Sequence, residues 1–119
     1  MSDSLPVLIC DDEPRLTMLT AGLLEQRGYR SKVANDGAKA LELASQEAFR
    51  LMLLDVNLAG MTALDVLRGL DAAGIELPVL LSSGYSAEDV PSELRDHPRV
   101  SGFLAKPYPV DRLIDAIGR

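Results

Sequence analysis

Short apolar runs alternate along the whole chain with stretches in which apolar residues recur at helical spacing. This alternation predicts strands joined by helices, which is typical of a parallel sheet covered by helices. The expected strands are residues 5–10, 29–33, 51–56, 77–82 and 100–105, and the expected helices start near Pro14, Asp36, Leu64, Ser86 and Pro109. We therefore expect an α/β fold with a doubly wound, five-stranded parallel sheet and helices on both faces.

Three of the predicted elements differ clearly in their apolar content. The first helix carries Leu16, Leu19, Leu23 and Leu24 on one face, which predicts a large apolar contact surface. The helix from about Ser86 to Leu94 offers few large apolar residues, so we expect it to pack loosely. The second strand is more polar than the others, which suits an edge of the sheet.

Composition narrows the class of protein. A chain of 119 residues fits one domain, and its 47% apolar and 25% charged residues are ordinary for a folded globular protein. The net charge of -6 and the scattered twelve Lys and Arg residues argue against binding of nucleic acid. A single cysteine, Cys10, a polar N-terminus without a signal peptide and short apolar runs predict a cytoplasmic protein without membrane contact of its own.

Charged and hydroxyl side chains follow several of the predicted strands. Asp11 and Asp12 end the first strand, Asp55 ends the third, Ser83 follows the fourth and Lys106 follows the fifth. Because the carboxyl ends of parallel strands lie at one edge of the sheet, these side chains should converge there. Open α/β sheets bind their ligands at that edge.

The chemistry of this set suggests a site for a metal ion and a phosphoryl group. Three adjacent carboxylates repel one another and raise their pKa values unless a hard cation neutralises them, and magnesium fits such oxygen ligands. Lys106 and the Ser83 hydroxyl can contact phosphoryl oxygens, which leaves Asp55 as the nucleophile.

Four motifs in order make the chain similar to a known family, the receiver domains of two-component response regulators. The motifs are Asp11-Asp12-Glu13, the segment from Leu53 to Met61 around Asp55, the segment from Pro78 to Gly84, and Phe103-Leu104-Ala105-Lys106-Pro107. The resemblance runs from about Leu5 to Ile117. It implies a flavodoxin-like strand order, 2-1-3-4-5, and a single domain over residues 1–119 without an output domain.

The resemblance also implies roles for the acidic residues. Asp55 would accept a phosphoryl group from a phosphohistidine, forming an acyl phosphate. Asp12, Asp55 and the backbone carbonyl of Asn57 would bind Mg²⁺, with Asp11 helping through water. Such a domain is a phosphoacceptor that catalyses its own phosphorylation and slow dephosphorylation, more a switch than an enzyme.

A switch is implied at the other end of the site. Ser83 would move toward the phosphoryl group, and Lys106, before an expected cis peptide bond to Pro107, would pair with it. Phe103 would then turn inward and reshape the face of the fourth helix, fifth strand and fifth helix. Asn57 and Tyr85 occupy positions that tune the lifetime of the phosphoryl group in this family.

The partners implied are a sensor histidine kinase or a histidine phosphotransfer protein, and a downstream protein target. A phosphorylation-dependent homodimer is one form that the output takes in such proteins. The chain would be a stand-alone regulator or part of a larger protein such as a hybrid sensor kinase.

The chain departs from the common pattern of the family at two positions in the loop after Asp55. Ala59 stands where many receivers have proline, and Ala63 where they often have glycine. The loop is therefore expected to differ in position, although neither residue is a reacting group.

Other readings remain at this point. Each motif alone is explained as well by a helix cap or a turn. A phosphohydrolase of the haloacid dehalogenase type would also use Asp, Ser and Lys, but its first motif resembles Asp-x-Asp, whereas Asn57 stands here. A receiver fold used only as an unphosphorylated scaffold is a third reading, which the complete residue set disfavours. Flavodoxin-like cofactor binding is weaker still, because no phosphate loop follows the first strand.

Overall fold

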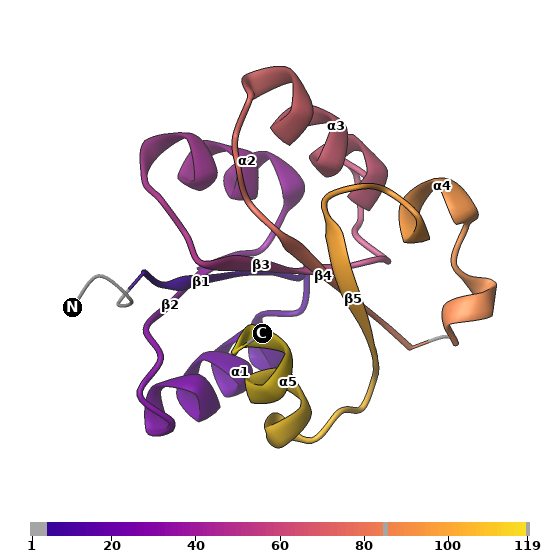
Figure 1. Ribbon diagram of the computed structural model, residues 1–119. Coiled ribbons are helices and arrows are strands. Elements are labelled where there is room, and N and C mark those ends of the chain that lie inside the picture. The colour runs from indigo at the N-terminus through magenta and orange to yellow at the C-terminus, as the bar shows by residue number, and fades with distance from the viewer. Residues whose placement is uncertain (1–4, 85, 119) are drawn as a thin grey trace.

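The computed structural model describes residues 5–84 and 86–118. Its strands are β1 (Val7–Cys10), β2 (Ser31–Ala34), β3 (Leu51–Asp55), β4 (Val79–Ser83) and β5 (Val100–Ala105). Its α-helices are α1 (Pro14–Gln26), α2 (Gly37–Gln46), α3 (Ala63–Ala73), α4 (Ser92–Arg95) and α5 (Val110–Ile117), with a 3₁₀ turn, η1, at Ala87–Asp89. Strands and helices alternate from end to end (Figure 1).

All five strands pair in parallel in the order β2-β1-β3-β4-β5. The predicted fold class, strand order and edge position of the polar second strand are confirmed. Parallel pairing places Cys10 beside Leu54 and Asp55 beside Ser82. The residues that follow the central strands are thereby brought to one edge of the sheet.

Helices cover both faces of the sheet (Figure 1). On one face, α2, α3 and α4 pack on a core of residues that include Leu8, Met52, Leu67 and Leu81. On the other, α1 and α5 pack on a smaller core. Within the described residues, none of the helices has both the length and the apolar character that crossing a bilayer requires.

Local sequence signals fix where the helices begin. Pro14 occupies the first turn of α1, where its missing amide hydrogen costs nothing. The side chain of Asp36 accepts a hydrogen bond from the amide of Lys39 and caps α2. Thr62 and Asp65 form a reciprocal capping box on α3. The loops that carry the site therefore end at firmly defined helix starts.

The predicted helix from Ser86 to Leu94 is wrong. The segment forms the short turn η1 and the four-residue α4, separated by Pro91. The cause is Pro91, because a proline disfavours helical backbone in the residue before it and lacks an amide donor. Val90 and Leu94 are buried, as the apolar pattern indicates. The segment between β4 and β5 is thus held to the core by Val90 and Leu94 and not by a continuous helix.

The apolar face predicted for α1 is only partly buried. The helix contacts the core through Thr17, Thr20 and Leu24, which are buried, whereas Leu19 is 60% exposed. The spacing of Thr17, Thr20 and Leu24 is itself helical, so the polar threonines belong to the buried face. Of the predicted leucine face, Leu24 is buried, Leu16 and Leu23 are half-buried, and Leu19 is left exposed.

The start of β5 is fastened to the end of α3. His97 Nε2 lies 3.0 Å from Asp71 Oδ2, and the guanidinium of Arg99 donates to Asp71 and to the backbone carbonyls of Ile75 and Leu70. The hydrogen bond from Arg99 lowers the pKa of Asp71. These contacts anchor the segment between α4 and β5 where α4 itself is short.

Candidate functional site

The carboxyl edge of the sheet gathers the acidic residues predicted from the sequence. Asp11 and Asp12 directly follow β1, and Asp55 is the last residue of β3. One carboxylate oxygen from each of the three lies within 4.8 Å of the others. Asp11 and Asp55 are each only 5% exposed, while Asp12 is more open to solvent. A tight cluster of hard oxygen donors results, which is suited to a divalent cation.

Lys106 brings the positive charge to this cluster. It follows β5, and its Nζ lies 2.8 Å from Asp11 Oδ2 and 3.4 Å from Asp55 Oδ1. The lysine side chain is 22% exposed, so the pairing is largely shielded from water. Because the shorter contact is to Asp11, Lys106 holds that carboxylate firmly and contacts Asp55 more weakly.

Burial and charge determine the protonation of the site. Burial raises the pKa of Asp55, and the charge of Asp11 raises it further. The amide of Asn57 and the Lys106 ammonium oppose that rise without cancelling it. Burial by itself lowers the pKa of Lys106, but its hydrogen bond to Asp11 and the charge of Asp55 raise it on balance. Lys106 therefore stays charged at neutral pH, while the Asp55 carboxylate is costly to keep ionised.

Backbone amides also hold the three carboxylates. The amide of Glu13 donates to Asp11 Oδ1 at 3.0 Å, that of Asn57 to Asp55 Oδ1 at 3.2 Å and that of Ala59 to Asp12 Oδ2 at 3.0 Å. Each of these hydrogen bonds is strengthened by the negative charge of the accepting carboxylate. The loops after β1 and β3 are thus shaped around the acidic side chains.

Asn35 is a supporting residue that the sequence pattern did not reveal. It belongs to the Asn-Asp-Gly segment expected to cap α2, and Asp36 provides that cap. Asn35 instead donates from Nδ2 to the backbone carbonyl of Asp11 at 3.0 Å and to Thr17 Oγ1 at 3.3 Å. The acidic turn is therefore held from β2 as well, through a contact that no local spacing predicts.

The remaining predicted residues lie at or near the same edge. Ser83 is the last residue of β4 and is fully buried, and its carbonyl accepts the amide of Lys106 at 2.7 Å. The Lys106–Pro107 peptide bond is cis, as expected. Phe103 is half-buried on β5 and packs against the core on the side of α4. Tyr85 lies outside the described residues.

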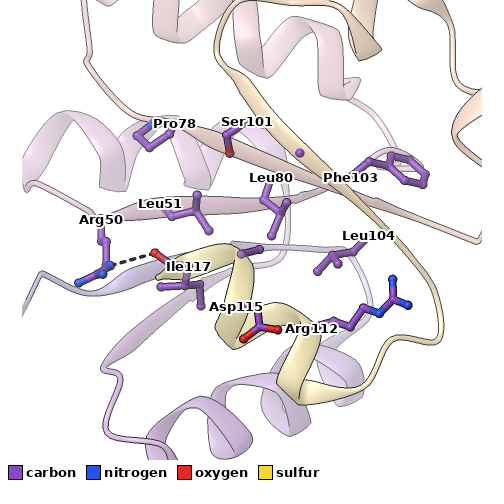
Figure 2. Close-up of a pocket in the computed structure, with 12 residues that line it drawn as sticks. Arg50, Leu51, Pro78, Leu80, Ser101, Phe103, Leu104, Arg112, Asp115 and Ile117 are labelled. Atoms are coloured by element: carbon purple, nitrogen blue, oxygen red, sulfur yellow. Dashed lines mark hydrogen bonds between the residues drawn. The ribbon is translucent and has the colours of Figure 1, made fainter. Parts of the chain in front are cut away.

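Among the described residues, two hollows border α5. One, of about 440 Å³, lies between β4, β5 and α5, with Arg50 at one end and Arg112 at the other (Figure 2). Arg50 Nε donates to the carbonyl of Ile117 at 3.4 Å, so the two arginines do not converge on one ligand position. The other hollow is a groove of about 420 Å³ between α1 and α5 that is mainly apolar and includes Lys106 in its lining. This second hollow adjoins the acidic cluster.

Comparison with known proteins defines the class. Residues 7–118 match the response regulator receiver domain family, and the chain belongs to that family. It is a receiver domain of two-component signalling, a phosphoacceptor module and not a classical enzyme, with an acidic pocket formed by Asp11, Asp12 and Asp55.

Individual relatives differ in how much of their length the chain matches. The transcriptional regulatory protein ZraR of Klebsiella oxytoca is 30% identical over 93% of this chain, which spans 25% of that protein. Sporulation initiation phosphotransferase F of Bacillus subtilis (strain 168) is 27% identical over 93% of this chain and 89% of its own length. The crystal structure of a sensor protein from Polaromonas sp. JS666 superposes with a TM-score of 0.86 at 28% identity, covering 97% of this chain and 94% of that one.

The raised pKa of Asp55 yields a prediction on stability. Without divalent cations, Asp55→Asn should increase the free energy of unfolding at pH 7. The folded state holds this proton more tightly than the unfolded state, so the penalty is full above the folded pKa and disappears below the unfolded value of about 3.9. Urea unfolding in EDTA, from pH 7 down to below about 3.9, measures the gain in the free energy of unfolding. This gain should shrink as the pH falls.

Glu76→Gln is the matched control for net charge, because Glu76 is exposed and precedes β4 at the opposite end of the strands. It should change stability little. A loss of stability in Asp55→Asn, or a gain that does not vary with pH, would contradict the interpretation.

Proposed function

We propose that Asp55 is the residue that accepts a phosphoryl group from a phosphohistidine. The observation that carries this proposal is the placement of Asp55 among Asp11, Asp12 and Lys106 at the carboxyl edge of the sheet. The amide of Asn57 donates to Oδ1 of Asp55, and Lys106 Nζ lies 3.4 Å from the same oxygen. An acid held in this way is positioned to attack and is paired with a cation that can offset the incoming charge.

The proposed reaction is an in-line transfer of a phosphoryl group from the donor histidine to Asp55. A carboxylate oxygen of Asp55 forms a bond to phosphorus while the bond between phosphorus and the donor imidazole nitrogen breaks. The electron pair of that bond stays on the nitrogen. Because the other ring nitrogen of the phosphohistidine carries a proton, the leaving group is a neutral imidazole, and Asp55 becomes an acyl phosphate. Lys106 stabilises the negative charge on the phosphoryl oxygens. The buried Ser83, at the end of β4, is proposed to donate its hydroxyl to the same group.

The donor set fits Mg²⁺. Asp12, Asp55 and the backbone carbonyl of Asn57 would hold the ion, with Asp11 contributing through water. Hard carboxylate oxygens within 4.8 Å of one another match its preference for oxygen ligands and only a few protein contacts. When bound, the ion neutralises the charge that the carboxylates and the phosphoryl group share.

Read-out is proposed through α4, β5 and α5. Phe103 is half-buried between the α4 side of the core and the surface, so its ring can occupy a more inward position when Ser83 moves. The short α4 favours such a change, because few contacts oppose it. Asn57, exposed beside Asp55, and Tyr85 are proposed to tune the lifetime of the phosphoryl group.

The setting of the domain is also a proposal. Receiver domains interact with histidine kinases or phosphotransferases, and we propose such a protein as donor in the cytoplasm and another protein, or a second phosphorylated copy, as target. The single-domain organisation expected from the sequence stays a prediction. The match to most of sporulation initiation phosphotransferase F and to a quarter of ZraR is compatible with either a stand-alone or a multidomain protein.

The proposed acceptor can be tested by phosphorylation with a small donor. Incubation with acetyl phosphate and Mg²⁺ should add the mass of one phosphoryl group to the intact protein. Asp55→Asn should gain none, and EDTA should prevent the gain in the unchanged protein. An unchanged mass in all samples would favour the scaffold reading, and equal phosphorylation of Asp55→Asn would exclude Asp55 as acceptor.

The groove beside Lys106 is the proposed docking surface for the phosphohistidine protein. Its lining residues are mostly apolar: Leu16, Leu19, Thr20, Leu23, Lys106, Pro107, Tyr108, Val110 and Leu113. Leu19 is 60% exposed, so this part of the apolar lining is open to a partner. Because Lys106 both lines the groove and contacts Asp55, a helix seated there would place a donor near the acceptor.

Leu19→Ala should therefore slow phosphoryl transfer from a histidine phosphotransfer protein by about fivefold or more, as expected for an interface residue worth ~1 kcal/mol. The rate with acetyl phosphate should stay unchanged, since that donor needs no docking. Met18→Ala is the matched control, because Met18 is 72% exposed on the same helix but does not line the groove. Equal effects of the two variants, or a loss of the acetyl phosphate reaction, would contradict this docking surface.

A further inference from the structure

The loop between β3 and α3 holds two of the acidic side chains through its own backbone. The amide of Asn57 donates to Asp55 at 3.2 Å, and two residues later the amide of Ala59 donates to Asp12 at 3.0 Å. The second bond joins residues 47 positions apart in the chain. It is therefore a direct link between the turn after β1 and the loop after β3.

Asp12 is the acid that most needs such a link. Asp11 and Asp55 are buried to 5% exposure and contact Lys106, which fixes their positions. Asp12 is more exposed, and an exposed carboxylate samples several rotamers that must be lost when it binds a cation. A hydrogen bond from a backbone amide to one of its oxygens removes that freedom in advance, while the carboxylate keeps further lone pairs for a cation.

We infer that the backbone amide of Ala59 is a positioning group for cation binding. By holding Asp12 Oδ2, it orients this carboxylate toward Asp55 and fixes the loop that carries the carbonyl of Asn57. The three proposed ligands are thus assembled before the ion arrives. This inference rests on the proposed function in taking Asp12, Asp55 and Asn57 as the cation ligands.

The position of Ala59 makes the group removable. Its side chain is exposed, so the contribution to the site comes from the amide and not from the methyl group. Proline is the one residue type without a backbone amide hydrogen. Ala59→Pro therefore removes the bond to Asp12, whereas Ala59→Ser keeps it.

A purely structural link would show a different pattern from a positioning group. If the bond only stabilised the loop, Ala59→Pro would lower the free energy of unfolding and leave the affinity of the folded protein for Mg²⁺ unchanged. If the amide positions Asp12, affinity for Mg²⁺ falls even where the protein is fully folded. The phosphorylation rate at saturating Mg²⁺ should recover, since Asp55 and Lys106 are untouched.

The first test is Mg²⁺ titration of the folded proteins without any phosphoryl donor, followed by calorimetry or amide chemical shifts. Ala59→Pro should weaken binding by about tenfold, in line with loss of a hydrogen bond to a charged group, and Ala59→Ser should bind as the unchanged protein does. Asp12→Ala, which loses a proposed ligand, sets the upper limit of the effect. Unchanged or tighter binding by Ala59→Pro would overturn the inference.

A second measurement needs no proline. In the metal-free protein, the amide of Ala59 should exchange with solvent more slowly than in Asp12→Ala, because its acceptor is then missing. Solvent-exchange NMR on the two proteins gives the comparison, and the amide of Lys39, bonded to Asp36, serves as an internal reference. Equal exchange at Ala59 in both proteins would overturn the inference even if Ala59→Pro failed to fold.

These tests are separate from that of the phosphoryl acceptor. Weaker Mg²⁺ binding by Ala59→Pro together with an unphosphorylated Asp55 would support the positioning role and exclude the proposed transfer. Phosphorylation of Asp55 with unaltered Mg²⁺ binding in Ala59→Pro would support the proposed transfer and exclude the positioning role.

Discussion

The pairing of Lys106 with Asp11 and Asp55 is the interaction on which the site depends. Three carboxylates within 4.8 Å would repel one another strongly at the edge of an apolar sheet. One partly buried ammonium, 2.8 Å from Asp11 and 3.4 Å from Asp55, offsets part of that repulsion. The balance is incomplete, since the pKa of Asp55 remains raised. Three carboxylates with one ammonium leave the site with a net negative charge. That uncompensated charge is the physical basis for expecting a metal ion there.

The parallel sheet is what allows such a cluster to exist. The register of its apolar strands fixes the positions of the polar residues at their carboxyl ends. The loops that follow supply backbone amides to the carboxylates. These amides have no charge to balance and no side-chain freedom to lose, so they orient acids at little cost. The same edge adjoins a groove between α1 and α5, which links the acidic site to a surface that a partner protein can cover.

Much of the fold and of the site followed from the sequence, because both depend on where apolar runs end. Asp55 and Lys106 were predicted to meet for that reason, and the sheet confirms the strand positions that bring them together. The bonds from Asn35 and Ala59 were not predicted, since they join loops through space and use groups whose partners leave no local pattern. The prediction of a continuous fourth helix was wrong because Pro91 interrupts it. The apolar face of α1 was predicted as a contact surface, but its spacing does not reveal that this face lines a groove.

The most direct measurement of the central claim is chemical mapping of the phosphoryl group. Borohydride reduces an acyl phosphate of aspartate to homoserine, and cleavage after arginine separates residues 51–68, which contain Asp55, from the N-terminal peptide with Asp11 and Asp12. After reaction with acetyl phosphate and Mg²⁺, fragmentation of peptide 51–68 should place homoserine at position 55. Homoserine at position 11, 12 or 65, or at no position, would contradict the account.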